Sequence, residues 1–172
     1  MALNKIFMKR GFLNYLTFYG ILFTNIINPN KIIALTQENI DIPKVFSYRS
    51  ASCGCCKKWI NHLRDNGLEV VDNIVEDVSA IKIQYQIPNN LRSCHSAQIG
   101  KYKIEGHVPI ESINKLLEEK PLISGLAVPG MPHGSPGMEI HLHESHSHDY
   151  ESYEVVTFSE SGKTKIFDKI SP

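Results

Sequence analysis

The sequence predicts an α/β domain with a central mixed β-sheet, flanking helices and a C-terminal β-hairpin. Three observations support this fold class. A strand-like run, a helical run and a second strand-like run open the domain, an amphipathic helix lies in its middle, and alternating apolar and polar residues fill its end. A strand–helix–strand beginning implies two parallel strands covered by a helix, whereas a hairpin adds antiparallel pairing.

The size and charge of the chain limit what it can do. Its 172 residues, 42% of them hydrophobic, fit one domain with a real core and a short appendage. The 18 basic and 18 acidic residues give a net charge of zero. Because no strong positive field is available to hold a phosphate backbone, we do not expect a nucleic-acid partner.

Residues 1–34 predict export. They carry four basic residues and no acidic ones, and an uncharged run over residues 11–28 follows the basic start. This order is typical of a secretory signal peptide ending near Ala34. Ile32 stands where a small residue usually precedes the cut, so cleavage is less secure than export. An uncleaved membrane anchor and a buried helix are the alternatives, and only the anchor brings the protein into contact with a membrane.

Residues 35–44 form a polar linker, and the folded domain, residues 45–172, follows. Its first predicted elements are the strands Val45–Arg49 and Leu68–Val75 and the helices Lys57–Asn66 and Asp77–Gln84. In the first helix, Trp59, Ile60 and Leu63 recur at helical spacing, and Gly67 follows as a stop signal.

The second half contains a polar bend over residues 91–97 and then alternates between strands and a helix. The predicted elements are a short strand Tyr102–Glu105, a helix Ile110–Lys120 and a hairpin of Tyr153–Phe158 with Lys163–Ile170. The helix is the clearest, since Ile110, Ile113 and Leu116 share one face. Residues 125–128 lead into a loop rich in glycine and proline.

Three cysteines lie at the junction of the first strand and first helix. Cys53 and Cys56 have C-x-x-C spacing, and thioredoxin-like folds use this arrangement for redox or metal chemistry. We therefore refine the predicted fold to thioredoxin-like. The free amide groups at a helix N-terminus favour negative charge, so a sulfur held there loses its proton more easily.

The additional thiol of Cys55 favours a metal site. Three sulfurs facing one space suit Cu(I), which prefers thiolate and thioether ligands, better than they suit a simple dithiol exchanger. Cys94 and His95 would complete the site with a fourth sulfur and an imidazole. The alternatives are a thiol-redox site, in which Cys53 attacks and Cys56 resolves, and purely structural disulfides. Zinc and other thiophilic ions also fit this donor set.

The loop over residues 129–139 offers further ligands. We expect it to lie against the cysteine turn, where Met131, Met138 and His133 would supply thioether or imidazole groups; alternatively these residues only shape and fill the loop. In the thioredoxin architecture a cis-proline lies at this place. The candidates for that proline are Pro129, Pro132 and, as runner-up, Pro109.

A histidine run follows in the predicted loop 139–150. It consists of His141, His143, His146 and His148. Clustered imidazoles in a polar segment can collect Cu(II), Zn(II) or Ni(II), and the alternative is an incidental polar loop.

Four motifs follow one another along the chain: SCGCCKKW at residues 52–59, LRSCHSA at 91–97, YKIEGHVP at 102–109 and GLAVPGMPHGSPGME at 125–139. From about residue 45 to its end, the chain resembles the CopG-type periplasmic copper-resistance family, also known as domain of unknown function 411. The histidine run departs from the shared pattern.

The resemblance implies a thioredoxin-like fold, a periplasmic location and a cysteine-rich site that binds copper, as a multi-copper cluster, with a suggested redox role between Cu(I) and Cu(II). The ligands it implies are Cys53, Cys55, Cys56 and Cys94, and less securely Met131, Met138 and nearby imidazoles. The resulting hypothesis is a periplasmic protein of copper resistance or homeostasis, working among other copper-handling proteins. A thiol-disulfide oxidoreductase and a metallochaperone remain the alternatives.

Overall fold

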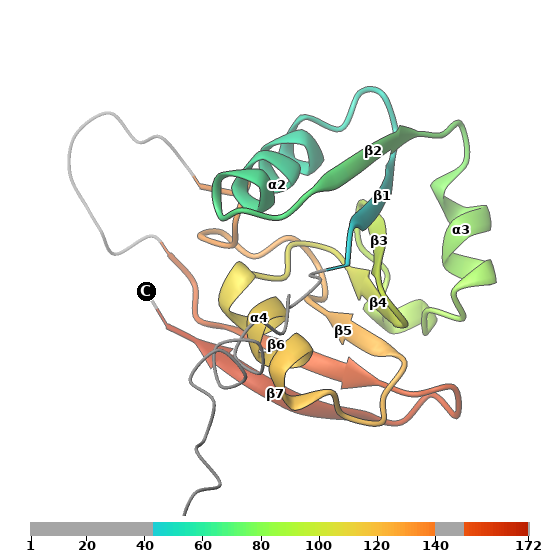
Figure 1. The fold of residues 1–172 in the computed structure, drawn as a ribbon, viewed down its shortest axis with the longest axis vertical. Coiled ribbons are helices and arrows are strands. Elements are labelled where there is room, and N and C mark those ends of the chain that lie inside the picture. Colours follow the sequence, from blue (N-terminus) through green and yellow to red (C-terminus); the bar gives the residue numbers. More distant parts are fainter. Residues whose placement is uncertain (1–42, 140–149, 172) are drawn as a thin grey trace, which may run out of the picture. The chain divides into compact units, whose positions relative to one another are not determined.

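A seven-stranded mixed sheet runs through the described part of the chain (Figure 1). The computed structural model describes residues 43–139 and 150–171. The strands are β1 (Val45–Arg49), β2 (Val70–Ile74), β3 (Ser96–Ile99), β4 (Tyr102–Glu105), β5 (Gly125–Ala127), β6 (Tyr153–Phe158) and β7 (Thr164–Ile170). The helices are α2 (Gly54–Asp65), α3 (Val78–Gln84), α4 (Ile110–Glu119) and a single 3₁₀ turn, η1 (Asn89–Leu91).

The order of the strands across the sheet is β2-β1-β3-β4-β5-β6-β7. The pairs β1–β2 and β4–β5 are parallel, and the other neighbours are antiparallel. The predicted parallel pair at the start of the domain is therefore confirmed. The C-terminal hairpin is confirmed as well, with Tyr153 opposite Ile170 at its open end.

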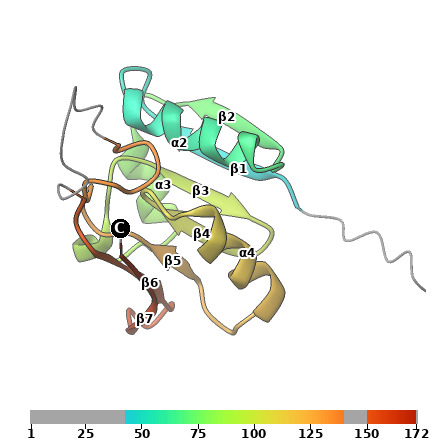
Figure 2. The same cartoon turned by 90° about the vertical axis from the view of Figure 1, so that its left-hand side faces the viewer.

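Helices α2 and α4 cover one face of the sheet, and α3 covers the other (Figure 1). Figure 2 shows the same arrangement from the side of α2 and α4, with α3 behind. Trp59 and Leu63 of α2 and Ile113 and Leu116 of α4 are almost fully buried in one cluster with residues of β1 to β6. The predicted apolar faces of both helices thus form the main core.

A buried ion pair lies on the opposite face. Lys82 of α3 contacts Glu105 of β4, with Nζ and Oε1 2.5 Å apart, and both side chains are buried. Glu105 also accepts hydrogen bonds from the Ser96 hydroxyl at 2.5 Å and from the Ser93 amide at 2.6 Å. A buried charge is tolerated when its lone pairs accept hydrogen bonds in this way. Through the Ser93 amide, Glu105 also holds the segment just before β3 in position.

Several elements differ from the prediction. Helix α2 begins at Gly54 rather than Lys57, which places Cys55 and Cys56 in its first turn. The segment predicted as a bend contains the start of β3, and β5 was not predicted. The expected cis-proline is wrong for all three candidates, since every peptide bond among the described residues is trans, including those of Pro109, Pro129 and Pro132.

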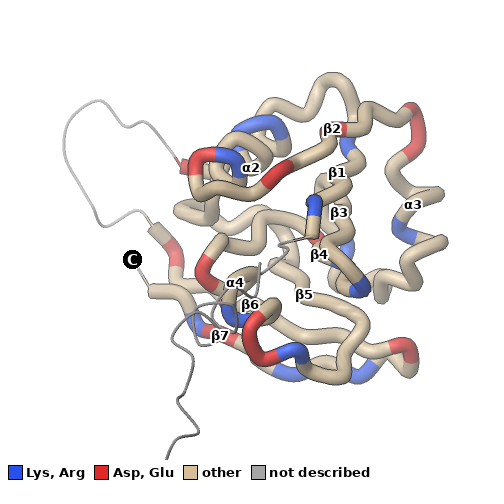
Figure 3. The backbone as a smooth tube through the Cα atoms, viewed as in Figure 1, with Lys and Arg blue, Asp and Glu red and all other residues tan. Residues whose placement is uncertain are grey.

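The predicted signal or anchor over residues 1–34, most of the linker and the histidine run lie outside the described residues. Within the described part, none of the helices combines the length and apolar character needed to cross a membrane. Basic and acidic positions are interspersed along the backbone there (Figure 3).

Candidate metal centre

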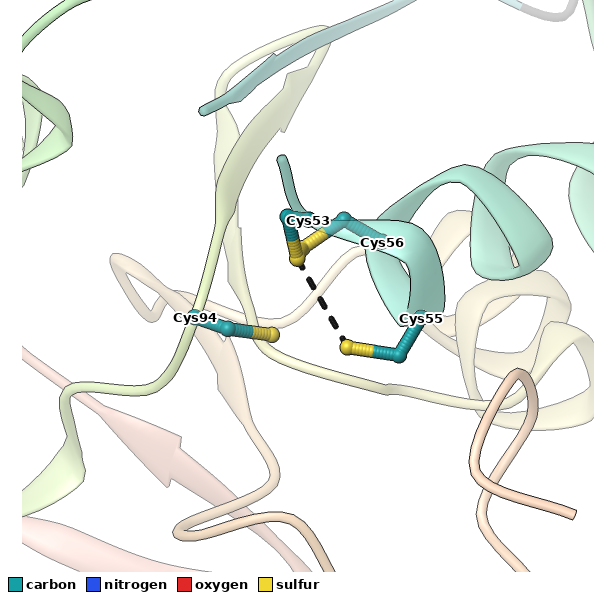
Figure 4. A group of neighbouring side chains, drawn as sticks. All are labelled: Cys53, Cys55, Cys56 and Cys94. Atoms are coloured by element: carbon teal, nitrogen blue, oxygen red, sulfur yellow. Dashed lines mark hydrogen bonds between the residues drawn. A yellow bond between two sulfur atoms is a disulfide. The ribbon is translucent and has the colours of Figure 1, made fainter. Parts of the chain in front are cut away.

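The four cysteines converge at the N-terminus of α2. Cys53 is the N-cap residue, Cys55 and Cys56 lie in the first turn, and Cys94 comes from the segment between η1 and β3. Their Sγ atoms all lie within 4.8 Å of one another. Figure 4 shows the sulfur of Cys94 directed toward Cys55 and the pair Cys53–Cys56. The predicted meeting of two distant segments is therefore present in the structure.

Two of the four sulfurs form a disulfide. Cys53 and Cys56 are bonded to each other, whereas Cys55 and Cys94 are free thiols. The Sγ atoms of Cys53 and Cys55 are 3.6 Å apart. Cys56 is fully buried, and the other three cysteines are half-buried. Cys53 is thus partly open to solvent, whereas Cys56 is not.

The helix end beside the sulfurs leaves its amide groups free. No side chain caps α2, its first turn contains no acidic residue, and its first intrahelical hydrogen bond runs from the Lys57 amide to the Cys53 carbonyl at 3.3 Å. Unpaired N–H groups and the helix dipole stabilise a negative charge at this place. A metal-bound thiolate carries such a charge, so this helix end suits the binding of a soft metal once the disulfide is reduced.

The β3–β4 hairpin positions Cys94. Ser96 is paired with Glu105, and the Gly106 amide donates to the His95 carbonyl at 3.1 Å, which extends the pairing beyond the strands. In the same register, residue 94 stands opposite residue 107. The Ser93 hydroxyl adds a hydrogen bond of 2.6 Å to the Gly130 carbonyl, so the segment is tied to the loop 129–139 as well.

His107 faces Cys94 with a free lone pair. Its Nε2 lies 3.0 Å from Cys94 Sγ, and its Nδ1 lies 2.7 Å from the Pro136 carbonyl oxygen. Burial lowers the pKa of His107, although the contacts with Pro136 and Glu139 oppose this shift, so the ring is neutral at pH 7. Because a carbonyl oxygen can only accept, Nδ1 must carry the hydrogen, and Nε2 is left as an acceptor directed at Cys94.

His95 is the second imidazole in contact with Cys94. The His95 Nδ1 lies 3.3 Å from Cys94 Sγ, and the ring packs against Trp59 and His107. Burial, and then the charges of His107, Lys82 and Arg49, lower the pKa of His95 well below its ordinary value. Its Nε2 has no hydrogen-bond partner. His95, Cys94 and His107 make up a second group whose ligand atoms lie within 4.8 Å of one another.

Cys94 is protonated in the absence of a metal ion. Burial, followed by the neighbouring Cys55, raises the pKa of the Cys94 thiol to about 12. An ion that binds there must displace this proton, as thiolate ligation generally requires.

The loop 129–139 lies against the cysteine turn, where we expected it. Gly137 has a φ of +88°, and a Cβ atom there would come within 2.6 Å of the Cys55 carbonyl oxygen and 2.8 Å of the backbone nitrogen of Trp59. Glycine is therefore required at this close approach. Met138 is half-buried in the loop, whereas Met131 and His133 are exposed. Among the described residues, His133 belongs to neither group of metal-ligating side chains.

Sequence reasoning missed His107. It identified the motif that contains this residue but assigned it no role, because a single histidine in a turn is a weak signal. The informative signal was the short hairpin around Gly100, whose register sets residues 94 and 107 opposite each other.

Comparisons with known proteins found a matching family model and similar solved structures. A family model described as "Protein of unknown function, DUF411" matches residues 91–138, the part that carries Cys94, His95 and His107. Two solved structures, both named copper resistance protein CopG (forms 2 and 1), are each 39% identical to the chain. They cover 76% and 77% of it, the chain covers 100% of each, and the TM-scores are 0.69 and 0.68. No curated protein sequence matches.

Proposed function

The chain belongs to the CopG copper-resistance family, and from this premise we propose that it binds copper as Cu(I) in the thiolate cluster of Cys53, Cys55, Cys56 and Cys94. The observation that carries the proposal is the convergence of four sulfur atoms, from two distant segments, within 4.8 Å. Thiolates select soft ions, and Cu(I) is the softest of the common biological metals that such a site takes.

Cu(I) binding by all four sulfurs requires that the Cys53–Cys56 disulfide be opened. A dithiol reductant would supply two electrons and two protons, becoming a disulfide itself as Cys53 and Cys56 become thiols, and the metal would then displace protons from the sulfurs. The site is thereby coupled to redox state, which fits a role in which copper changes between Cu(I) and Cu(II). A multi-copper cluster follows if the sulfurs bridge between ions.

Further donors extend the proposed site. Met131 and Met138 supply thioethers and His95 and His133 supply imidazoles, and we give the loop residues a smaller share because Met131 is 51% exposed. The histidine run, His141, His143, His146 and His148, would act as an accessory collector of Cu(II) or Zn(II).

The proposed setting is the periplasm, with residues 1–34 as the export signal or anchor, and other copper-handling proteins as partners. We also propose that residues 45–172 form a thioredoxin-like domain. The parallel β1–α2–β2 unit, the C-x-x-C pair at the start of α2 and the β3–β4 hairpin beside it support this assignment.

A matched substitution tests the copper site. We expect Cys55→Ser to lower the Cu(I) affinity of the reduced protein by about 100-fold, because one ligand of a four-ligand site contributes about 3 kcal/mol. The measurement is an anaerobic titration of the full chain against a chromogenic Cu(I) chelator. Unchanged stoichiometry and affinity in this variant would contradict the proposal.

One observation favours a second candidate function, thiol-disulfide exchange. The disulfide joins a half-buried Cys53 to a fully buried Cys56, which is the exposure expected of an attacking and a resolving cysteine. In the reduced protein, the Cys53 thiolate would attack a substrate disulfide and expel one substrate thiolate. Cys56 would then attack Cys53 and release the second, leaving a reduced substrate and an oxidised pair.

The same variant separates the two functions. Thiol-disulfide exchange does not use Cys55, so Cys55→Ser should retain the reduction of a model disulfide. Full disulfide reductase activity together with unaltered copper binding would favour the exchange enzyme over the copper protein.

A further inference from the structure

We propose that Cys94, His95 and His107 form a second metal site, for a divalent ion such as Zn(II) or Cu(II), which remains available when Cys53 and Cys56 are joined in a disulfide. The inference goes beyond the Cu(I) cluster and does not rest on it. It requires one sulfur and two imidazole nitrogens, a donor set of borderline softness.

The spacing of the three ligand atoms fits such an ion. Cys94 Sγ lies 3.0 Å from His107 Nε2 and 3.3 Å from His95 Nδ1. In a tetrahedral zinc site with Zn–S near 2.3 Å and Zn–N near 2.0 Å, a sulfur and a nitrogen ligand are about 3.5 Å apart. Outward shifts of a few tenths of an ångström therefore bring the three groups to the spacing of a metal site.

The orientation of His107 is that of a metal ligand. Metal-binding histidines usually donate their second ring N–H to a carbonyl or carboxylate, which fixes the tautomer and aims the other nitrogen at the ion. The Pro136 carbonyl has this role here, at 2.7 Å from Nδ1. The carbonyl thus holds His107 in position before any ion arrives.

His95 has an unused nitrogen in the interior. Its side chain is 0% exposed, and Nε2 is one of two buried side-chain polar atoms among the described residues without a hydrogen-bond partner. Neither ring nitrogen of His95 is therefore held by a strong hydrogen bond to another protein group. Packing against Trp59 holds the ring instead. The ligand nitrogen, Nδ1, has only the long contact of 3.3 Å with Cys94 Sγ, so an ion bound there displaces no strong hydrogen bond.

The disulfide removes two sulfurs from the cysteine cluster but none of the three ligands proposed here. Cys94 is a free thiol in the structure, and imidazoles do not take part in thiol oxidation. Cys94 belongs to both groups, so the two sites cannot be filled independently. The oxidation state of Cys53 and Cys56 would then select between a sulfur-rich site for Cu(I) and a nitrogen-rich site for a divalent ion.

Cobalt(II) is a suitable probe, because a cobalt–thiolate bond gives a charge-transfer band that histidines alone do not give. The experiment uses the full chain with its disulfide intact and the four histidines of the run, His141, His143, His146 and His148, replaced by Asn. We expect the band to saturate at one cobalt per chain. Cys94→Ala should abolish it, His107→Asn should weaken cobalt binding by about 100-fold, and the matched control Cys55→Ala should retain it.

Three results would overturn the proposal: no charge-transfer band in the oxidised protein, a band that survives both His95→Asn and His107→Asn, or a band lost only with Cys55. Substitution of a buried histidine can disturb folding, so the ligands are also identified in a protein whose three proposed ligands are unchanged. Zinc X-ray absorption of the oxidised protein with the substituted run should show imidazole scattering and one sulfur. A shell without sulfur, or without imidazole, contradicts the site. The Cu(I) titration uses reduced protein, so either proposal can fail alone.

Discussion

The two sides of Cys94 differ in how they are built. On one side stand the sulfurs of Cys53, Cys55 and Cys56, mostly half-buried, two of them joined in a disulfide. On the other side stand two fully buried imidazoles, one held by a backbone carbonyl and one by packing. The sulfur side changes with redox conditions, whereas the imidazole side is fixed by the fold. One shared thiol can therefore serve two kinds of metal chemistry.

The position of Cys94, which the two sides share, depends on the buried ion pair of Lys82 and Glu105 on the opposite face of the sheet. Glu105 holds the Ser93 amide next to Cys94, and Lys82 neutralises Glu105. We expect Lys82→Met to lower the free energy of unfolding by about 3–5 kcal/mol, because it leaves a buried carboxylate unpaired. Urea unfolding followed by circular dichroism measures this change.

The matched control for this prediction is the double variant Lys82→Met, Glu105→Gln. It removes both charges, so most of the lost stability should return. If the single and double variants are equally unstable, the ion pair does not support the segment before β3. Other contacts must then hold Cys94 in position.

Cys94→Ala should impair metal binding both in the cysteine cluster and in the site with His95 and His107. In the reduced protein we expect a loss of about 100-fold in Cu(I) affinity, similar to that of Cys55→Ser. The contrast lies in the oxidised protein, where only Cys94→Ala should abolish the cobalt band. Parallel titrations of the two variants in both redox states provide the measurement. An oxidised Cys94→Ala protein that still shows the band would assign it to Cys55 instead.

The smallest expected effect concerns the loop that covers the sulfur side. Met138→Leu removes a thioether from a half-buried position while keeping the volume of the side chain, and we expect a loss of about threefold in Cu(I) affinity. Met131→Leu serves as the exposed comparison and should lose less. The same Cu(I) competition titration resolves the order of the two. A greater loss for Met131 would place the exposed thioether closer to the copper.

Local patterns were sufficient for much of the fold. The runs at Val45–Arg49, Ile110–Glu119 and Tyr153–Phe158 carry strong periodicity, and the structure has elements with nearly the predicted bounds. Strand β3 was missed because Ser96 is buried as a partner of Glu105, a reason that no local pattern reveals. Strand β5 has three residues, too few for a periodic signal.

The candidate site was predictable in its sulfurs but not in its second imidazole. Cysteine spacing indicated Cys53, Cys55 and Cys56, and the small number of cysteines in the chain left Cys94 as the natural fourth. The role of His107 depends on strand pairing, which joins residues 13 positions apart. Its tautomer depends on the Pro136 carbonyl from a third segment.

The tight turn at Gly100 and Lys101 joins β3 to β4 at the end of the hairpin farthest from Cys94 and His107. Five residue pairs, from 99/102 to 95/106, separate the turn from Cys94 and His107, a span of roughly 17 Å at about 3.3 Å per residue. An insertion of one residue there would slip the strands past each other and turn alternate side chains to the wrong face. The alignment of the ligands thus depends on the length of a turn that is remote from them, and sequences related to this one should keep that length.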